Sequence, residues 1–317
     1  MSHAARFALD PHKPADAEIG RIAREQMAVI RGSLAEALAK APEDAAGRAE
    51  PIHEARKGLK RLRALARFVQ GSIPDAEYKR HNTQLRDAAR LLSSGRDAFV
   101  MDGVFKGLSE QLSPASLEAL DPFAQKLAAQ GQESADGAIG DADRMLAEAE
   151  TELDRLVPQK ARPRRLLASA AEAYGRCRRA WLSALRDTTD ETLHEWRKSV
   201  KYVRHHAELL QPAASDLLEA LEALWHELGD RLGDNNDLAI LAAAARRELD
   251  AQEREDAVAV GLQELLDAIA ARQKELSAEA LDLGRQLLAE RPRTYRQHLR
   301  ALWAGAANSG PDSAGGS

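Results

Sequence analysis

Apolar residues recur along most of this chain with the spacing of an amphipathic helix. In the first such stretch, Ile22, Met27, Ile30 and Leu34 fall on one side of a helix predicted from about residue 16 to residue 40. The same periodicity predicts further helices over about 51–70, 76–94, from near 97, 164–186, 191–211, 213–232, from 237, 255–290 and 291–303. Because no stretch gives a clear strand pattern, the expected fold class is all-α.

Prolines and capping residues divide the predicted helices. Pro51 is expected to open the second helix, a position that proline favours, and Asp97 is expected to cap the fourth. Residues 111–163 look less regular and end at PQKARP, which we take as the boundary between two halves. The expected organisation is an irregular arm, two helical halves and a tail that is disordered by composition, over residues 1–14, 15–160, 161–304 and 305–317.

Two basic stretches of the chain are closely similar. IHEARKGLKRLRALARFVQ spans residues 52–70, and LHEWRKSVKYVRHHAELLQ spans residues 193–211. A second pair, LLSSGRDAFVM and RLGDNNDLAIL, has almost the same offset and aligns Asp97 with Asp237. These pairs indicate an internal duplication. We therefore expect two bundles of the four-helix type, related by a pseudo-twofold axis.

Each basic stretch forms one cationic stripe on a helical wheel. The first stripe spans roughly 120° and lies opposite Leu59, Leu62 and Leu65. Like charges three and four residues apart repel, so the stripes indicate a counter-charge from elsewhere, although a solvated helix face is the alternative. The stripes contain His53, Arg56, Lys57, Lys60, Arg63 and Arg67 in the first copy and His194, Arg197, Lys198, Lys201, Arg204 and His205 in the second.

The charge of the whole chain narrows the kind of ligand. Its 317 residues include 45 Lys and Arg against 50 Asp and Glu, a formal net charge of −5. A basic focus inside an acidic remainder suits an enclosed anion better than a broad nucleic-acid or membrane surface. Arginine binds phosphate through paired N–H donors, and a ladder of cations along a helix matches a linear chain of phosphates. Histidine would add a donor on protonation near pH 6–7.

Composition also bears on the cellular setting. The chain has no run of about 18 apolar residues, and its first residues lack the apolar segment of a secretory signal. A single cysteine, Cys177, excludes an internal disulfide. We therefore expect a cytoplasmic protein that has no membrane partner.

At these residues the chain resembles the CHAD family, the conserved histidine α-helical domain. The resemblance rests on the two basic stretches, on SGRDAFV and on LGDNNDLAIL, and it spans about residues 15–303. It implies a pair of four-helix bundles with a basic central channel or pocket, binding of inorganic polyphosphate, and association with polyphosphate granules. By position, the resemblance implies ligand contacts from His53, Arg56, Lys57, Lys60, Arg63, His194, Arg197, Lys198, Lys201 and Arg204.

The chain departs from the family pattern at two places. Asn235 and Asn236 stand where members often have a basic residue or histidine, and Tyr202 aligns with Arg61. Both departures predict an asymmetric site that is stronger on the first helix. Further arginines are candidates to complete the channel, with an ordinary exposed arginine as the alternative for each: Arg24, Arg31, Arg176, Arg179, Arg293, Arg296 and Arg300.

Metal binding and catalysis find little support in the sequence. HEARK and HEWRK lack the second histidine of the zinc motif H-E-x-x-H, and cations beside each histidine would oppose a divalent metal. No phosphate-binding glycine-rich loop occurs, and Cys177, whose pKa nearby cations would lower, has no identifiable base partner. We expect no enzymatic activity, no metal and no cofactor.

Two other classes of protein remain open at this stage. A basic helix can track the phosphates of a nucleic acid, although the acidic remainder and the absence of stacking aromatics disfavour this. The stripes could instead dock onto acidic helices of a protein partner. Preference for long linear polyphosphate over DNA distinguishes these classes.

Overall fold

The computed structural model describes residues 7–41, 44–92, 94–130, 135–251 and 256–309. In these ranges the chain forms α-helices and short 3₁₀ turns and no strand, which confirms the all-α fold class. The α-helices are α1 Ala15–Ala39, α2 Ala45–Val69, α3 Asp75–Leu91, α4 Ser94–Leu108, α5 Pro114–Ala119, α6 Asp121–Gln130, α7 Ala135–Thr151, α8 Pro163–Arg186, α9 Asp190–Leu210, α10 Ser215–Asp250, α11 Ala257–Leu287 and α12 Pro292–Asn308. None of the described helices is both long and apolar enough to cross a membrane.

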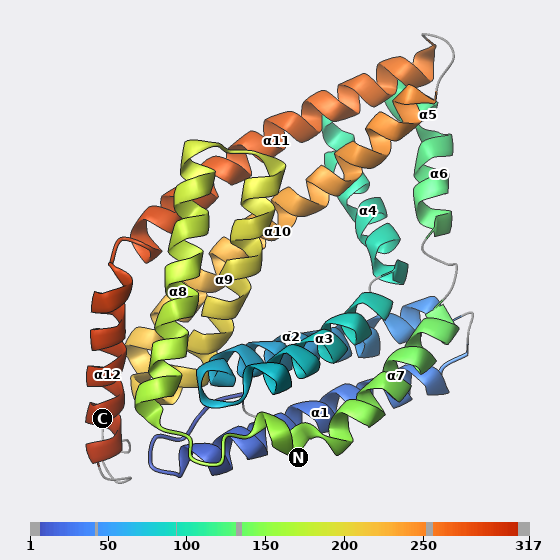
Figure 1. The fold of residues 1–317 in the computed structure, drawn as a ribbon. Helices are drawn as coiled ribbons and strands as arrows, with labels where there is room; N and C mark the ends of the chain where they lie inside the picture. Colours follow the sequence, from blue (N-terminus) through green and yellow to red (C-terminus); the bar gives the residue numbers. More distant parts are fainter. Residues whose placement is uncertain (1–6, 42–43, 93, 131–134, 252–255, 310–317) are drawn as a thin grey trace.

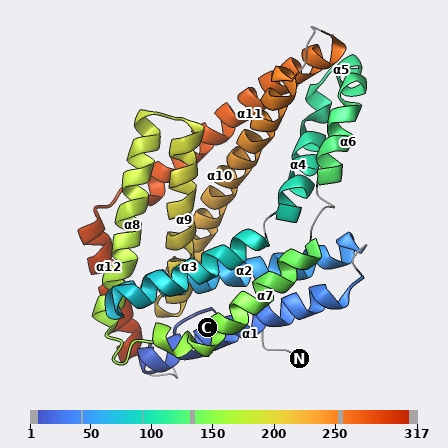
Figure 2. The ribbon, with the colours of Figure 1, turned by 45° about the vertical axis from the view of Figure 1, so that its right-hand side comes forward.

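The first group of helices consists of α1, α2, α3 and α7, which lie together in Figures 1 and 2. Their apolar faces form one core, in which Ile22, Ile30, Leu62 and Leu146 are fully buried. Gly58 allows α1 and α2 to approach closely, since a Cβ atom there would lie 2.6 Å from Ile30 Cγ1. Burial of this apolar surface is the main stabilising term for the group.

The second group consists of α8, α9 and parts of α10 and α11. Trp181, Trp196 and Trp225 occupy its core, and α12 packs on the outer side of α8. At that contact the rings of Tyr174 and Tyr295 stack with centroids 4.0 Å apart. The second basic helix, α9, therefore belongs to this group and also contacts α2.

A third core lies at the far end of the molecule, where α4, α5 and α6 pack on α10 and α11 (Figure 1). It joins Phe105 and Phe123 to Leu241 and Leu265. Residues 94–130 therefore pack on helices of the second half of the chain, although α7 returns to α1 and α3. The chain crosses between the two sides more often than a boundary near residue 160 suggests.

Several predicted helix boundaries were wrong. Pro51 does not open α2, which begins six residues earlier because Asp44 Oδ1 accepts a hydrogen bond of 2.8 Å from Gly47 N. Residues 111–163 contain α5, α6 and α7 rather than irregular chain. The helices predicted over 213–232 and from 237 are one helix, α10. Asp237 lies inside it and caps nothing, whereas the side chain of Asp97 lies outside the described residues.

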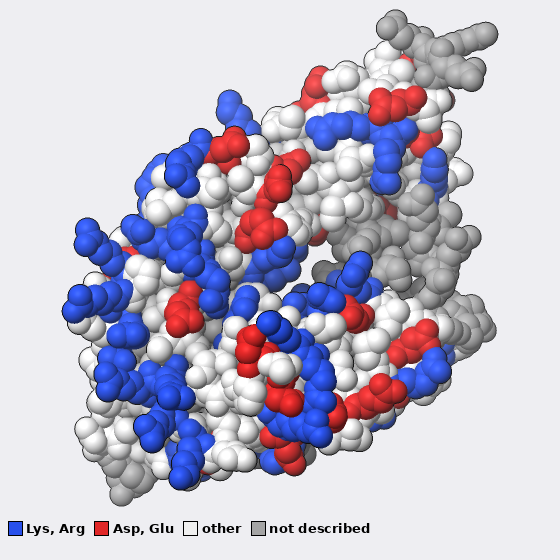
Figure 3. Space-filling view, viewed as in Figure 1, with Lys and Arg blue, Asp and Glu red and all other residues white. Residues whose placement is uncertain are grey.

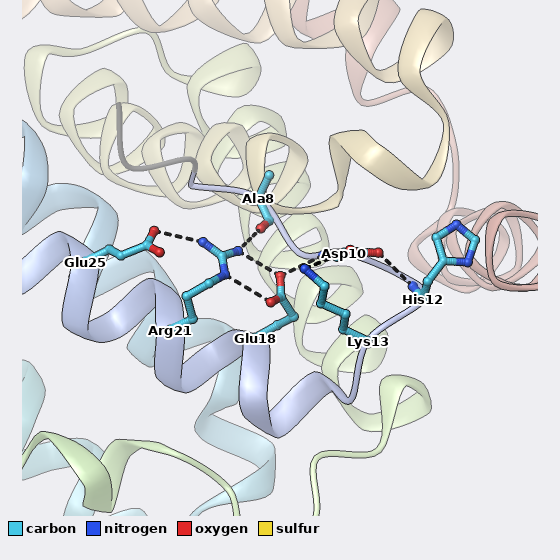
Figure 4. A network of polar contacts seen from close by, with 7 residues as sticks. All are labelled: Ala8, Asp10, His12, Lys13, Glu18, Arg21 and Glu25. Atoms are coloured by element: carbon cyan, nitrogen blue, oxygen red, sulfur yellow. Dashed lines mark hydrogen bonds and ion pairs between the residues drawn. The ribbon is translucent and has the colours of Figure 1, made fainter. Parts of the chain in front are cut away.

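Residues 7–14 form an arm without helix that runs over α1 and reaches α9. Leu9 N donates a hydrogen bond of 2.9 Å to Leu209 O, and Phe7 and Leu9 are buried in the first core. Figure 4 shows the polar contacts of the arm: Arg21 Nη2 donates to Ala8 O at 2.9 Å, and Asp10 N donates to Glu18 Oε2 at 3.1 Å. The arm thus connects α1 to the end of α9.

An ion pair on α1 supports the arm. Arg21 Nη2 lies 2.7 Å from Glu18 Oε2, and Glu18 is buried. The hydrogen bond from Arg21 holds the pKa of Glu18 below its usual value, although burial alone would raise that pKa. Glu18 is therefore ionised at neutral pH and remains able to accept the hydrogen bond from the arm.

Candidate functional site

The two basic helices, α2 and α9, cross and contact each other through their second halves (Figure 1). His206 Nε2 of α9 donates a hydrogen bond of 3.0 Å to the carbonyl of Ala64 in α2. Burial lowers the pKa of His206 to about 3, so the ring is neutral and its donor is the Nε2–H. Arg61 of α2 forms an ion pair with Glu208 of α9. The structure therefore brings the first and second basic stretches into contact.

Lys201 of α9 is half-buried and lies close to other positively charged side chains. Burial lowers its pKa to about 7, and Arg197 and Arg204 of the same helix and Lys60 of α2 lower it further. Asp237 of α10 acts in the opposite direction and only partly offsets them. A lysine held this way is only part-charged at neutral pH, and a bound anion would restore its full charge.

Two arginines of α2 donate hydrogen bonds to neutral groups. Arg56 Nη1 donates to the carbonyl of Leu92 at 2.5 Å. Arg63 donates to Asn82 Oδ1 at 3.5 Å and to the Tyr202 hydroxyl at 3.3 Å. Carbonyl, amide and phenol groups therefore help to orient these guanidinium groups.

Two glycines of α10 lie next to arginines of α9. A Cβ atom on Gly233 would lie 3.8 Å from Arg197 Nε, and one on Gly229 would lie 3.8 Å from Arg204 Nη1. Arg204 Nη1 also lies 3.1 Å from His226 Nδ1. The sequence analysis did not use these glycines, although their spacing of four residues in ELGDRLG places both on one helix face.

The first lysine of each basic motif pairs with the glutamate of the same motif. Lys57 Nζ lies 3.3 Å from Glu54 Oε1, and Lys198 Nζ lies 2.6 Å from Glu195 Oε1. Exposed pairs of this kind contribute only about 0–1 kcal/mol, so a phosphate can displace the glutamate at little cost. These lysines lie at the rim of the site rather than at its centre.

The two histidines at the start of the motifs are both exposed. His194 Nδ1 lies 2.5 Å from Asn236 Oδ1 of α10, and with the amide oxygen as acceptor Nδ1 carries the proton. His53 lies one turn before Arg56 on α2. Asn236 stands where members of the family often have a basic residue or histidine. In this chain it orients His194 instead.

His205 does not belong to the cationic face on which the helical wheel placed it. The ring is buried, its Nδ1 lies 3.0 Å from Glu208 Oε2, and it meets the Phe7 ring edge-on at 6.1 Å between centroids. Burial lowers its pKa. The wheel could not show this, because the arm that covers His205 comes from a distant part of the chain.

Beside Arg67 of the first motif, Arg176 extends the cationic region onto α8. The Arg67 guanidinium lies 5.6 Å from the Tyr78 ring centroid and 5.1 Å from that of Tyr202. Arg176 of α8 is half-buried beside Arg67, and burial followed by that neighbouring charge lowers its pKa. Arg67 was part of the predicted stripe, but its contacts with the two tyrosines could not be predicted from the periodicity of α2.

The other candidate arginines are not brought to this place. Arg24 pairs with Asp154 at 3.0 Å, and Arg31 pairs with Asp143 and Glu150 at 3.0 and 2.9 Å, so both face the α7 side of the first group. The remaining candidates lie on α8 and α12, outside the α2–α9 contact: Arg179, Arg293, Arg296 and Arg300.

The chemistry of a reactive thiol does not fit Cys177. We expected neighbouring cations to lower its pKa, but the thiol is fully buried and burial raises the pKa. Asp237 was considered as a metal ligand from the sequence. Its carboxylate accepts a hydrogen bond of 3.3 Å from Asn236 Nδ2. Within the described ranges, no three His, Cys, Asp or Glu side chains are grouped so as to hold a metal ion.

Comparisons with known proteins agree on the fold. A family model, the CHAD domain, matches residues 28–246. Among solved structures, the crystal structure of the CHAD domain from the plant Ricinus communis matches with a TM-score of 0.66 and 19% sequence identity. That match covers 91% of this chain and 96% of the plant chain, and at this identity it speaks for the fold alone. No curated protein matches the chain.

Proposed function

Because this chain belongs to the CHAD domain family, we propose that it binds inorganic polyphosphate between α2 and α9. The family is associated with polyphosphate binding. The proposal includes a cationic channel or pocket built from two duplicated helices, and cytoplasmic association with polyphosphate granules.

The observation that carries the proposal is the crowding of positive charge at Lys201. Burial, Arg197 and Lys60 all work against the charged form of this lysine, and Asp237 only partly offsets them. Strongly perturbed ionisable groups cluster at functional sites, and a bound anion would stabilise the charged form of this lysine. A linear polyphosphate supplies closely spaced negative charges that reach both helices at once.

The proposed ligand contacts divide into a centre and a rim. Lys60, Lys201 and the arginines of the two motifs form the centre, and the more exposed lysines and histidines form the rim. Arginine offers two parallel N–H donors to one phosphate, and lysine adds a point charge that follows the chain. The centre consists of Arg56, Lys60, Arg63, Arg197, Lys201 and Arg204, and the rim of His53, Lys57, His194 and Lys198.

Calorimetric titration with long-chain polyphosphate tests the proposal directly. The wild-type protein should bind it, and a double variant, Lys60→Glu with Lys201→Glu, should bind at least tenfold more weakly, since each charge-assisted contact contributes about 1.5–3 kcal/mol. A matched control is Lys106→Glu with Lys126→Glu, which makes the same charge change at the far end of the molecule. An equal loss of affinity in both variants would show that binding depends only on the net charge of the protein. It would contradict the assignment of the site to α2 and α9.

Duplex DNA at equal phosphate concentration is the decisive competitor. Equal or tighter binding of DNA would favour the nucleic-acid class, which the basic helices alone permit. If neither polyanion binds, the result would favour the alternative in which the cationic stripes dock onto an acidic protein partner. In either case the polyphosphate proposal fails.

We propose binding without catalysis. Incubation with polyphosphate, followed by an assay for released phosphate, tests this part. Release above the buffer control, lost in the double variant, would show instead that the protein hydrolyses its ligand. A fluorescent fusion tests the granule association, and it should leave the granules when it carries the double substitution.

A further inference from the structure

Outside the proposed site, arginines gather along α8 and α12. Figure 3 shows Lys and Arg side chains spread over the side of the molecule where Figure 1 places these two helices. The arginines of α12 are three and four residues apart and share one helix face. Those of α8 fall within an arc of about 120° on one side of that helix. They are Arg293, Arg296 and Arg300 on α12 and Arg164, Arg165, Arg176 and Arg179 on α8.

The arginines of α12 differ in their partners from three exposed arginines elsewhere in the chain. Arg144, Arg272 and Arg285 each pair with a carboxylate three residues away. Within the described part of the chain, no carboxylate forms an ion pair with the three arginines of α12. Glu172 of α8 is an acid on this face and lies beside Arg176.

Arg300 shows the lack of counter-charge most clearly. Its Nε atom is covered but has no hydrogen-bond partner. Burial lowers the pKa of its guanidinium, and Arg296 and Arg164 lower it further. Arg300 therefore lies where α8 and α12 bring cations together, and a solvated face alone does not account for this arrangement.

The arginines of α8 and α12 are continuous with the site between α2 and α9. Arg176 lies close enough to both Arg67 of α2 and Arg179 of α8 for their charges to lower its pKa. At Gly175 a Cβ atom would lie 3.7 Å from Arg179 Nη1 and 3.3 Å from Pro292 Cγ, so Arg179 borders the start of α12. From Arg164 to Arg179 the path along α8 measures about 22 Å, at 1.5 Å per residue.

We propose that α8 and α12 form a second, exterior run of anion contacts over which a long polyphosphate chain continues from the site between α2 and α9. This inference rests on the proposed function. It follows that affinity depends on chain length, because a short chain fills only the site between α2 and α9. The exterior run is an extension of binding and not a separate site for a small phosphate compound.

The test compares tripolyphosphate with long-chain polyphosphate on a triple variant, Arg293→Gln, Arg296→Gln and Arg300→Gln. Affinity for tripolyphosphate should stay within twofold of wild type, and affinity for the long chain should fall at least tenfold. The salt dependence of long-chain affinity should also flatten by about two in its log–log slope, by analogy with about 0.7 per phosphate contact on single strands. The matched control, Arg144→Gln, Arg272→Gln and Arg285→Gln, removes the same charge and should change neither affinity.

The possible outcomes distinguish the proposed function from the exterior run of anion contacts. If wild type binds neither chain, the proposed function fails and this inference fails with it. If wild type binds both and the α12 variant loses neither, or loses both equally, the function stands and the exterior run is overturned. If the variant instead loses only duplex DNA, the surface serves nucleic acid. A second variant, Arg164→Gln with Arg179→Gln on α8, should repeat the length-selective loss and guards against misfolding of α12, which circular dichroism reports.

Discussion

Lys201 should make polyphosphate binding depend on pH near neutrality. Its pKa of about 7 in the free protein means that binding above that pH must first charge the lysine, which weakens affinity. Affinity for polyphosphate should therefore rise about tenfold between pH 8 and pH 6. In Lys201→Arg, which stays charged throughout, this rise should largely disappear. Titrations of both proteins at a fixed ionic strength measure the effect.

The exposed histidines offer a competing cause of the same pH trend. Protonation of His53 or His194 would also strengthen binding as pH falls. A double variant, His53→Gln with His194→Gln, should keep most of the trend if Lys201 causes it. A trend that survives in Lys201→Arg and vanishes in the histidine variant would assign the effect to the histidines.

Lys201 should also reduce the stability of the free protein. In the unfolded chain its pKa is near 10.5, so folding carries a cost that is complete below about pH 7 and is relieved as pH rises toward 10.5. Lys201→Met should therefore raise the free energy of unfolding at pH 6 by about 1–2 kcal/mol, and the gain should shrink toward pH 10. Lys198→Met, at an exposed residue of the same helix, is the control and should change stability little. Urea unfolding at the two pH values measures this, and a gain that does not depend on pH would contradict it.

At the scale of elements, two glycines should respond in opposite directions to alanine. A Cβ atom on Gly284 of α11 would lie 2.6 Å from Trp181 Cδ1 and 2.8 Å from Trp196 Cζ2, so Gly284→Ala should destabilise by about 1–3 kcal/mol. On Gly233 of α10 the new atom meets Arg197 at an ordinary 3.8 Å, and Gly233→Ala should stabilise by up to about 1 kcal/mol through helix propensity. Thermal unfolding compares the two, and equal shifts would show that helix propensity dominates both.

Helix positions were predictable wherever a regular apolar stripe coincides with a clear end signal. α1, α8 and α9 came within a residue or two of expectation for this reason. α10 did not, because GDNND looks like a turn but its Asn235 is buried and donates to Gln273 O at 3.1 Å and to Ser277 Oγ at 3.0 Å of α11. These contacts with another helix favour a continuous α10 over a local turn, and local sequence carries no sign of them.

For the whole molecule, the separate far core should allow damage there without loss of the site. Phe123 meets Phe105 edge-on at 6.3 Å in that core, and Phe123→Ala should cost about 3–5 kcal/mol. Polyphosphate affinity should nevertheless stay within twofold, since the proposed contacts lie on α2 and α9. Phe68→Ala is the matched control: Phe68 meets His206 at 5.2 Å beside the α2–α9 contact, and its loss should weaken binding. Loss of binding in Phe123→Ala would show that the cores are coupled.

The residues of the proposed site were easier to predict than their surroundings. Repetition of one motif in two places identified α2 and α9 without any knowledge of packing. The burial of Lys201, the removal of His205 from the cationic face and the pairing of Arg31 with α7 all depend on which element lies opposite. That information comes from contacts between residues far apart in the chain, and periodicity within one helix cannot supply it.

The arm formed by residues 7–14 has a consequence for the order of events during synthesis. Leu9 N bonds to Leu209 O, so the arm's partner is made 200 residues after the arm itself. At about 5–20 residues per second, the ribosome needs roughly 10–40 seconds to supply that partner. During this interval Phe7 and Leu9 have no place beside α9, and the nascent chain exposes two apolar side chains that a chaperone can hold. The first described segment to leave the ribosome is thus among the last to reach its final contacts.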